Sequence, residues 1–172
     1  MQSDATMNSN PAGLAAGTIA AIGAATLGGA WFFEFVLGIK PCPMCLEQRY
    51  AYYLVIVLGI ALALGASRLP RTLAIAVLAV LALAAFGNAI YGAFHAGVEW
   101  GFWKGPASCS GPMVDFGKAG DILNRLSTEK VIRCDEVQWR FLGISLAGYN
   151  FLISGLMGLV ALFGISRMRA GA

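Results

Sequence analysis

Four long hydrophobic blocks alternate with shorter polar segments along this chain. The blocks cover approximately residues 14–35, 45–66, 72–94 and 141–165. Each reaches the roughly 20 residues that a helix needs to cross a hydrocarbon core of ~30 Å. Because the backbone of a spanning segment finds no water to bond with, each block is expected to be helical. The pattern therefore predicts an all-α fold, an integral membrane four-helix bundle forming one domain over residues 1–172.

The composition supports a membrane protein over a soluble one. Of the 172 residues, 58% are hydrophobic and only 12% are charged, whereas soluble domains carry roughly 25% charged residues. The formal net charge of +3 is small, so nucleic acid is not an expected partner. The expected surroundings are a lipid bilayer.

Arginines predict how the bundle is oriented. Two of them bracket the connection between the second and third blocks, and two follow the fourth block. By the positive-inside rule these segments face the cytoplasm, so both termini are predicted to be cytoplasmic. The remaining loops, approximately residues 36–44 and 95–140, would then face outward. The four arginines are Arg68, Arg71, Arg167 and Arg169.

All four tryptophans fall near the ends of blocks on the predicted outer side. Aromatic belts normally occupy both membrane interfaces, so this one-sided placement has two interpretations. The rings either form an asymmetric anchor or line a site for a flat, apolar ligand. They are Trp31, Trp100, Trp103 and Trp139.

The longer outer loop contains a segment, residues 113–126, that mixes apolar and charged side chains. It is either an amphipathic helix in the membrane interface or an ordinary loop that is apolar by chance.

The first outer loop carries a C-x-x-C motif, Cys42 to Cys45, of the kind found in zinc sites and in thiol redox centres. Pro43 suits the first position of a helix, which would make Cys42 the N-cap and place Cys45 in the first turn. The positive end of the helix dipole lowers a thiol pKa, and so does a nearby arginine. Arg49 lies four residues beyond Cys45, on the same helix face. We therefore expect Cys45 to be the activated thiol of a redox pair.

Three other interpretations of this pair are weaker, the simplest being that the two cysteines occur together by coincidence. A structural disulfide across two intervening residues closes almost no loop and adds little stability. A zinc site would require a second closely spaced pair of ligands. Cys109 and Cys134 are 25 residues apart and His95 is the only histidine, so no metal is predicted.

Cys109 lies among glycines, prolines and serines, and is expected to be exposed and mobile. A disulfide to Cys134 would close a loop of about 25 residues, which would stabilise the fold by ~3 kcal/mol if it were only structural. A disulfide that exchanges with an incoming thiol needs access instead. The turn-forming surroundings favour exchange.

Several ionisable residues lie near the outer ends of the blocks, where they are either hydrated or functional. Arg49 is placed to stabilise a thiolate and to bind a polar carbonyl group. His95 is either a proton donor to a reduced ligand, since its pKa lies near working pH, or the partner in a structural hydrogen bond.

Together these motifs resemble the DsbB family, bacterial inner-membrane proteins that reoxidise the periplasmic dithiol oxidase DsbA. The resemblance covers nearly the whole chain. Two segments carry it, residues 40–49 (Lys-Pro-Cys-Pro-Met-Cys-Leu-Glu-Gln-Arg) and 134–143 (Cys-Asp-Glu-Val-Gln-Trp-Arg-Phe-Leu-Gly), together with His95. The chain departs from the pattern at Pro43 and Met44, where two aliphatic residues are more familiar.

The resemblance implies a catalytic role for all four cysteines. Reduced DsbA would attack Cys109, whose partner is Cys134, and the electrons would pass to Cys42 and Cys45 through a transient Cys42–Cys134 link. Cys45 would deliver them to a membrane quinone, ubiquinone or menaquinone. The residues expected to bind the quinone are Arg49, His95 and Glu47.

Three alternatives stay open. Relatives of vitamin K epoxide reductase also couple a C-x-x-C motif to a quinone, but their active motif usually comes late in the chain, whereas Cys42 and Cys45 come early. A specialised DsbB paralogue serving one dedicated oxidase would have the same cysteines. From a different class, a non-enzymatic tetraspan scaffold would hold two inert structural disulfides and have no need of Arg49.

Overall fold

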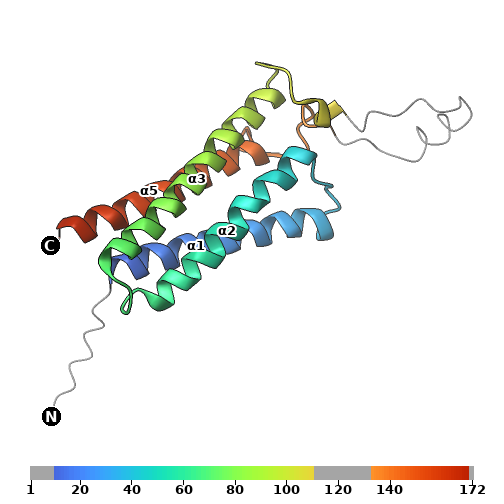
Figure 1. Cartoon of the computed structure of the whole chain (residues 1–172). Coiled ribbons are helices and arrows are strands. Elements are labelled where there is room, and N and C mark those ends of the chain that lie inside the picture. Colours follow the sequence, from blue (N-terminus) through green and yellow to red (C-terminus); the bar gives the residue numbers. More distant parts are fainter. Residues whose placement is uncertain (1–9, 111–132, 171–172) are drawn as a thin grey trace, which may run out of the picture.

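The computed structural model describes residues 10–110 and 133–170 of the chain. Four long helices pack lengthwise into a bundle (Figure 1), and each is long and apolar enough to cross a membrane. This confirms the predicted all-α four-helix membrane bundle. The segment 113–126, predicted to be either an amphipathic helix or an ordinary loop, lies outside the described residues. The helices are α1 (Pro11–Trp31), α2 (Pro43–Gly65), α3 (Arg71–Glu99) and α5 (Leu146–Ala170).

The start of α1 and the end of α5 lie at one end of the bundle, and the segments that carry the cysteines gather at the other end (Figure 1). A short 3-10 helix, η2 (Ala107–Ser110), lies against the start of α2. This arrangement is the one that four spans with both termini on the same side require. Which side that is stays a prediction from the arginines.

Two helices differ from the predicted limits in ways that matter for the site. α3 continues to Glu99 rather than ending near residue 94, which places His95 on the helix instead of in the loop. The fourth helix begins at Leu146 rather than near residue 141. The intervening residues form a tight antiparallel hairpin of β1 (Arg140–Phe141) and β2 (Ile144–Ser145).

The geometry of that hairpin explains the late helix start. Leu142 and Gly143 connect the two strands, and both have positive φ angles, 49° and 81°. Two successive residues in this region turn the chain back on itself as a type I′ hairpin does.

The first helix, α1, continues past Trp31 as a turn of π-helix, η1 (Phe32–Val36).

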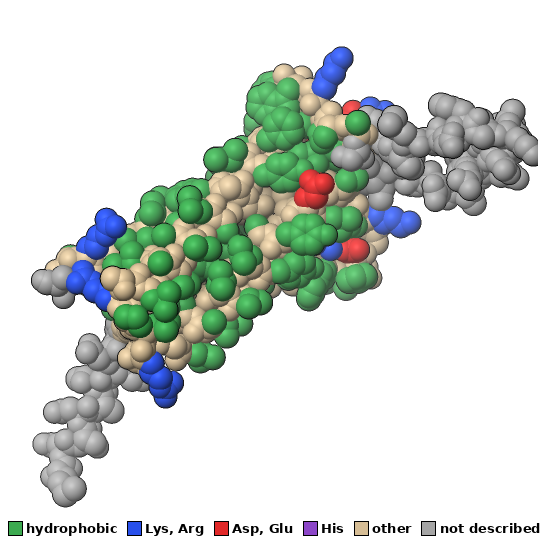
Figure 2. Space-filling model, viewed as in Figure 1, with side chains coloured by type: hydrophobic (Ala, Val, Ile, Leu, Met, Phe, Trp, Pro, Cys, Tyr) green, Lys and Arg blue, Asp and Glu red, His purple; other side chains and the backbone are tan. Residues whose placement is uncertain are grey.

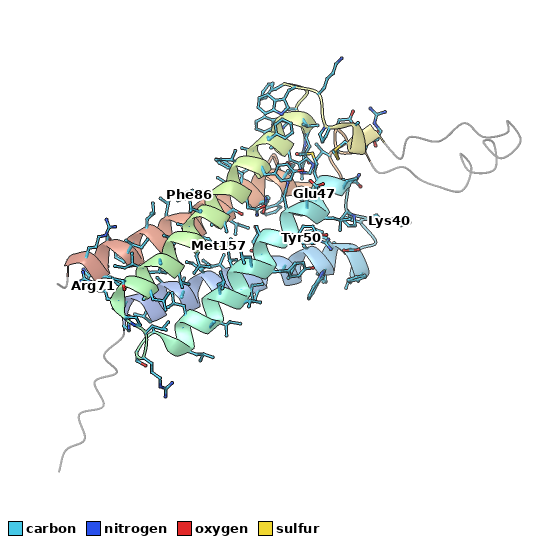
Figure 3. The ribbon with its side chains drawn as sticks, viewed as in Figure 1. Lys40, Glu47, Tyr50, Arg71, Phe86 and Met157 are labelled. Carbon is cyan, nitrogen blue, oxygen red and sulfur yellow. A yellow bond between two sulfur atoms is a disulfide. The ribbon has the colours of Figure 1, made fainter. Side chains whose placement is uncertain are left out.

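Small residues bring α1 and α2 into close contact. A Cβ atom added at Gly59 would lie 2.9 Å from the carbonyl oxygen of Ala16 and 3.0 Å from Cβ of Ala20. Close approach of this kind is the usual basis of helix packing in membranes, where burial of apolar surface offers little driving force. Between α3 and α5, the ring of Phe86 occupies the space above Gly158, near Met157 (Figure 3).

A buried polar cluster joins three helices in the outer half of the bundle. The Tyr52 hydroxyl on α2 donates to Oδ1 of Asn150 on α5 at 2.5 Å. Asn88 on α3 donates its amide to the same oxygen at 3.1 Å and to Ser154 at 3.0 Å. None of the predictions from the sequence included this cluster. The available signal was two asparagines within otherwise apolar blocks.

Charged side chains gather at the two ends of the bundle, and the face seen in Figure 2 is hydrophobic or uncharged between them. Many large apolar side chains along the helices are exposed, including Leu64, Leu83 and Ile90, each at least 71% exposed. Exposed apolar surface on this scale is unusual for a soluble monomer. It fits a bundle whose sides contact lipid.

Candidate redox site

The first cysteine pair occupies the start of α2 as the sequence predicted. Cys42 is the N-cap, Pro43 is the first helical residue, and the backbone N–H of Cys45 donates to Cys42 Sγ at 3.3 Å. Both cysteines are free thiols, with their sulfur atoms 2.7 Å apart. Cys42 is buried, while Cys45 is partly exposed. The two sulfurs are therefore close enough to join as a disulfide.

His95 reaches this pair from α3. Its Nε2 lies 3.6 Å from Cys42 Sγ, and its Nδ1 lies 3.1 Å from Nε2 of Gln48. An amide nitrogen only donates, so in this arrangement Nδ1 accepts and the ring proton sits on Nε2, facing the sulfur. His95 and Gln48 are 2% and 6% exposed, which shields the contact from water.

Gln48 was not among the predicted site residues. It lies one helical turn beyond Cys45, and residues three apart on a helix share a face. A glutamine inside an apolar block was the available signal, but its partner, His95, is 47 positions away in the sequence.

The structure favours Cys42, not Cys45, as the activated thiol. The hydrogen bond from the Cys45 side chain lowers the pKa of Cys42 to about 5, with a further contribution from His95 that acts against the cost of burial. The sequence placed the thiolate on Cys45, whereas this geometry favours Cys42. The reason is that the N-cap position gives Cys42 the backbone N–H, the neighbouring thiol and the imidazole together.

The second pair forms a disulfide between Cys109 and Cys134. The two residues are 5% and 1% exposed and belong to the same buried cluster as Cys42, Met44 and Val98. The expectation of an exposed Cys109 was therefore wrong. The 3-10 turn η2 packs this cysteine against the ends of α2 and α3, where its disulfide lies beside the first pair.

A cavity of about 390 Å³ opens beside Cys45, between α1, α2 and α5. Its size falls within the roughly 300–1,000 Å³ of small-molecule sites, which are mostly apolar with a few polar groups. The polar groups here include Cys45, Gln48 and Arg49. Aromatic side chains form part of the wall, namely Phe33, Tyr52, Trp139, Phe141 and Tyr149.

Of the four tryptophans, only Trp139 lines this cavity. Its ring stacks on Phe141 at a centroid distance of 6.0 Å and packs against Phe33 at 4.8 Å. Trp31, Trp100 and Trp103 are between 43% and 56% exposed. The ligand-lining interpretation thus fits one tryptophan, and the anchoring interpretation fits the other three.

The three residues predicted to bind a quinone are placed differently. Arg49 lines the cavity and forms an ion pair with Glu34, with 2.6 Å between the charged atoms. His95 contacts Cys42 and does not line the cavity wall. Glu47 is also absent from that wall and accepts a hydrogen bond from the Tyr91 hydroxyl; Figure 3 shows it near the start of α2. Their roles toward a ligand stay predictions.

A family model described as "Disulfide bond formation protein DsbB" matches residues 13–164, which include all four cysteines, His95 and Arg49. The chain belongs to the DsbB family. No solved structure gives a significant match to it.

Curated relatives of this DsbB-family chain carry the name Disulfide bond formation protein B. One from Aromatoleum aromaticum is 30% identical over 163 residues, covering 88% of this chain and 90% of the relative. Another from Verminephrobacter eiseniae is 32% identical over 146 residues, covering 82% and 78%. A third from Albidiferax ferrireducens is 30% identical over 151 residues, covering 84% and 81%.

Family membership and the fold together define the class of this protein. It is a multi-pass membrane protein with four helices able to span a bilayer, and it belongs to a family of disulfide-forming oxidoreductases. Two cysteine pairs that lie against each other in the described structure are the parts that such chemistry needs.

Proposed function

We propose that this protein reoxidises a DsbA-type dithiol oxidase in the periplasm and passes the two electrons to a quinone of the bacterial inner membrane. One observation carries the proposal. The Cys109–Cys134 disulfide shares a buried cluster with Cys42, and the partner of Cys42, Cys45, borders the apolar cavity. The proposed electron route runs through both pairs, from the loops to the membrane.

The residues around the cavity fit a quinone head group. The flat rings of Trp139 and Phe141 provide an apolar wall, and Arg49 provides a donor for a carbonyl oxygen. Cys45 is the sulfur at the cavity, and Gln48 adds a second polar group beside it. A bound quinone would supply the oxidising power, because it takes up two electrons and two protons.

The first exchange involves the outer pair. A thiolate of the reduced partner attacks Cys109, and the second partner thiol then resolves the mixed disulfide. The partner leaves oxidised, and Cys109 and Cys134 become thiols, so two electrons have entered. Since Cys109 is only 5% exposed, the segment that carries it has to yield to an incoming thiol.

The second exchange transfers the electrons inward. The Cys134 thiolate attacks Cys42 of the oxidised inner pair and releases Cys45. Cys109 then attacks Cys134 and releases Cys42, which restores the outer disulfide. A leaving thiol departs faster when its pKa is low, and the pKa of Cys42 is lowered to about 5 by its bonds to Cys45 and His95. The N-cap environment therefore favours the inward transfer.

His95 and Gln48 control the proton at Cys42. With Nδ1 facing the amide of Gln48, the imidazole presents its Nε2 proton to the sulfur at 3.6 Å. That contact stabilises the thiolate until it re-forms a disulfide with Cys45, whose sulfur is 2.7 Å away.

Quinone reduction by the purified protein tests the proposal. A reduced DsbA-type protein is the electron donor, and ubiquinone and menaquinone are compared as acceptors. The wild type should reduce at least one of them, and Cys45→Ala and Cys109→Ala should each abolish the reaction. Tyr53→Phe is the matched control, because Tyr53 lies on the outer face of α2, 41% exposed and away from the cavity.

A silent wild type would count against the proposal. If neither quinone is reduced and all four cysteines resist reduction, the scaffold with two structural disulfides becomes the better explanation. If only Cys45→Ala is inactive, electrons enter without the outer pair and the two-step route is wrong.

A further inference from the structure

Three side chains able to bind a metal meet at the start of α2. The sulfurs of Cys42 and Cys45 and a ring nitrogen of His95 lie within 4.8 Å of one another. Two thiolates and one imidazole form a ligand set that proteins use for zinc, with the fourth position open. We propose that the reduced Cys42–Cys45 pair and His95 bind a zinc ion. This goes beyond the thiol exchange and quinone reduction proposed above, neither of which uses a metal.

The distance between Cys42 Sγ and His95 Nε2 already matches that of a zinc centre. With Zn–S near 2.3 Å and Zn–N near 2.05 Å, a tetrahedral ion holds a sulfur and a nitrogen about 3.6 Å apart. Cys42 Sγ and His95 Nε2 are 3.6 Å apart in the structure. These two atoms therefore need little movement to share an ion.

The two sulfurs, by contrast, must move apart to bind zinc. Two thiolates on one tetrahedral zinc ion stand about 3.8 Å apart, whereas the sulfurs of Cys42 and Cys45 are separated by 2.7 Å. Cys45 is partly exposed and borders the cavity, so its sulfur has space to swing outward by the required ~1 Å. The same movement leaves the open coordination position on the cavity side.

Gln48 supplies the support that a metal-bound imidazole requires. Such a histidine almost always bonds through its second nitrogen, which fixes the ring and its tautomer. The amide of Gln48 lies 3.1 Å from Nδ1. Turning the amide presents its oxygen to an Nδ1 proton and frees the Nε2 lone pair for the ion.

Glu99 adds an acidic side chain to this corner of the bundle. It follows His95 by one turn of α3, close enough to act electrostatically on both His95 and Cys42. Its Oε2 is buried and has no hydrogen-bond partner within residues 10–110 and 133–170. A buried carboxylate oxygen without a partner is costly, and a nearby cation would compensate it.

Zinc binding would hold the protein in its dithiol state. The ion displaces the thiol protons to solvent and transfers no electrons, so the two sulfurs stay reduced. Thiolates that both coordinate zinc do not close into a disulfide until the ion leaves. A zinc ion would thus interrupt electron transfer at the inner pair and protect it from oxidation.

A cobalt titration tests the site. The parent protein carries Cys109→Ala and Cys134→Ala, so that its only thiols are Cys42 and Cys45. It is reduced, desalted without oxygen and titrated with Co²⁺, whose thiolate charge-transfer absorption reports binding. Zn²⁺ added afterwards should abolish that absorption, and the competition yields its affinity.

Variants of His95 and Gln48 distinguish zinc binding at the proposed three-ligand site from zinc binding by the two thiols alone. His95→Leu should weaken zinc binding at least tenfold, and Gln48→Leu by about tenfold, as expected for a residue that orients a ligand. Tyr53→Phe should bind like the parent. An unfolding transition recorded for each variant shows that the bundle is intact.

Two results would overturn the proposal: no charge-transfer absorption from the reduced parent, or equal zinc affinity with and without His95. If the His95→Leu variant does not fold, the zinc affinities of Gln48→Leu and His95→Gln test the proposal instead. The assay contains neither quinone nor partner protein, so its failure leaves the proposed function untouched, and a failure of quinone reduction leaves this site untouched.

Discussion

Arg49 of α2 and Glu34 of η1 form an ion pair beside the cavity, with 2.6 Å between their charged atoms. Their side chains are only 13% and 23% exposed. The sequence suggested that Arg49 serves the thiolate, but its observed partner is this carboxylate. The pair ties the end of the first span to the start of the second and holds the guanidinium where it borders the cavity.

The first prediction follows from that ion pair. Glu34→Gln removes the charge that holds Arg49 and should raise the KM for quinone about threefold, which corresponds to about 0.7 kcal/mol, within the range of partly solvated pairs. Arg49→Gln should raise it at least tenfold, because the donor itself is lost. Steady-state kinetics at several quinone concentrations provide the measurement. A larger effect at Glu34 than at Arg49 would mean that the carboxylate, not the arginine, contacts the ligand.

A second prediction concerns the protonation of Cys42. In the reduced Cys109→Ala, Cys134→Ala protein, thiolate absorbance in the ultraviolet should appear as the pH rises through about 5, the lowered pKa of Cys42. The sign follows from the depressed pKa: the thiolate is present above this value and is lost below it. His95→Leu should move the midpoint upward, since the imidazole contact is lost. Absorbance that develops only near the ordinary thiol pKa of about 8.5 would show that the N-cap environment does not stabilise the thiolate.

The third prediction tests the buried polar cluster. Tyr52→Phe removes the hydroxyl that donates to Asn150 at 2.5 Å and should destabilise the bundle by about 0.6–1.7 kcal/mol, the average and the maximum measured for hydrogen bonds between membrane helices. Tyr53→Phe, one residue along and 41% exposed, should be neutral. Unfolding of the detergent-solubilised protein by denaturant compares the two. Equal stability of both variants would show that the cluster contributes nothing to holding α2 against α5.

A fourth prediction uses two glycines in different surroundings. Gly59→Ala places a methyl group 2.9 Å from the Ala16 carbonyl oxygen and should cost about 1–3 kcal/mol as overpacking. Gly87→Ala meets no atom within 4 Å and should be neutral or stabilising by up to about 1 kcal/mol, because alanine favours the helix. The same unfolding assay serves both. Similar effects at the two positions would contradict the close contact between α1 and α2.

Hydrophobic pattern alone determined much of the architecture. A membrane leaves an apolar segment of twenty residues little choice but a helix, so four blocks predicted four spanning helices. Local sequence also predicted the start of α2: Pro43 indicated the first helical residue and the N-cap position of Cys42, and the structure confirms both. Both inferences rest on short-range constraints that neighbouring residues impose on the backbone.

Contacts between distant segments could not be read in this way. The sequence indicated a thiolate at Cys45, but His95, brought in from 53 positions away, together with the capping geometry, favours Cys42. The glycines and prolines around Cys109 indicated exposure, but packing against α2 and α3 buries it. Only the tertiary structure decides these points, because burial and the partners of a charge depend on which helix faces which.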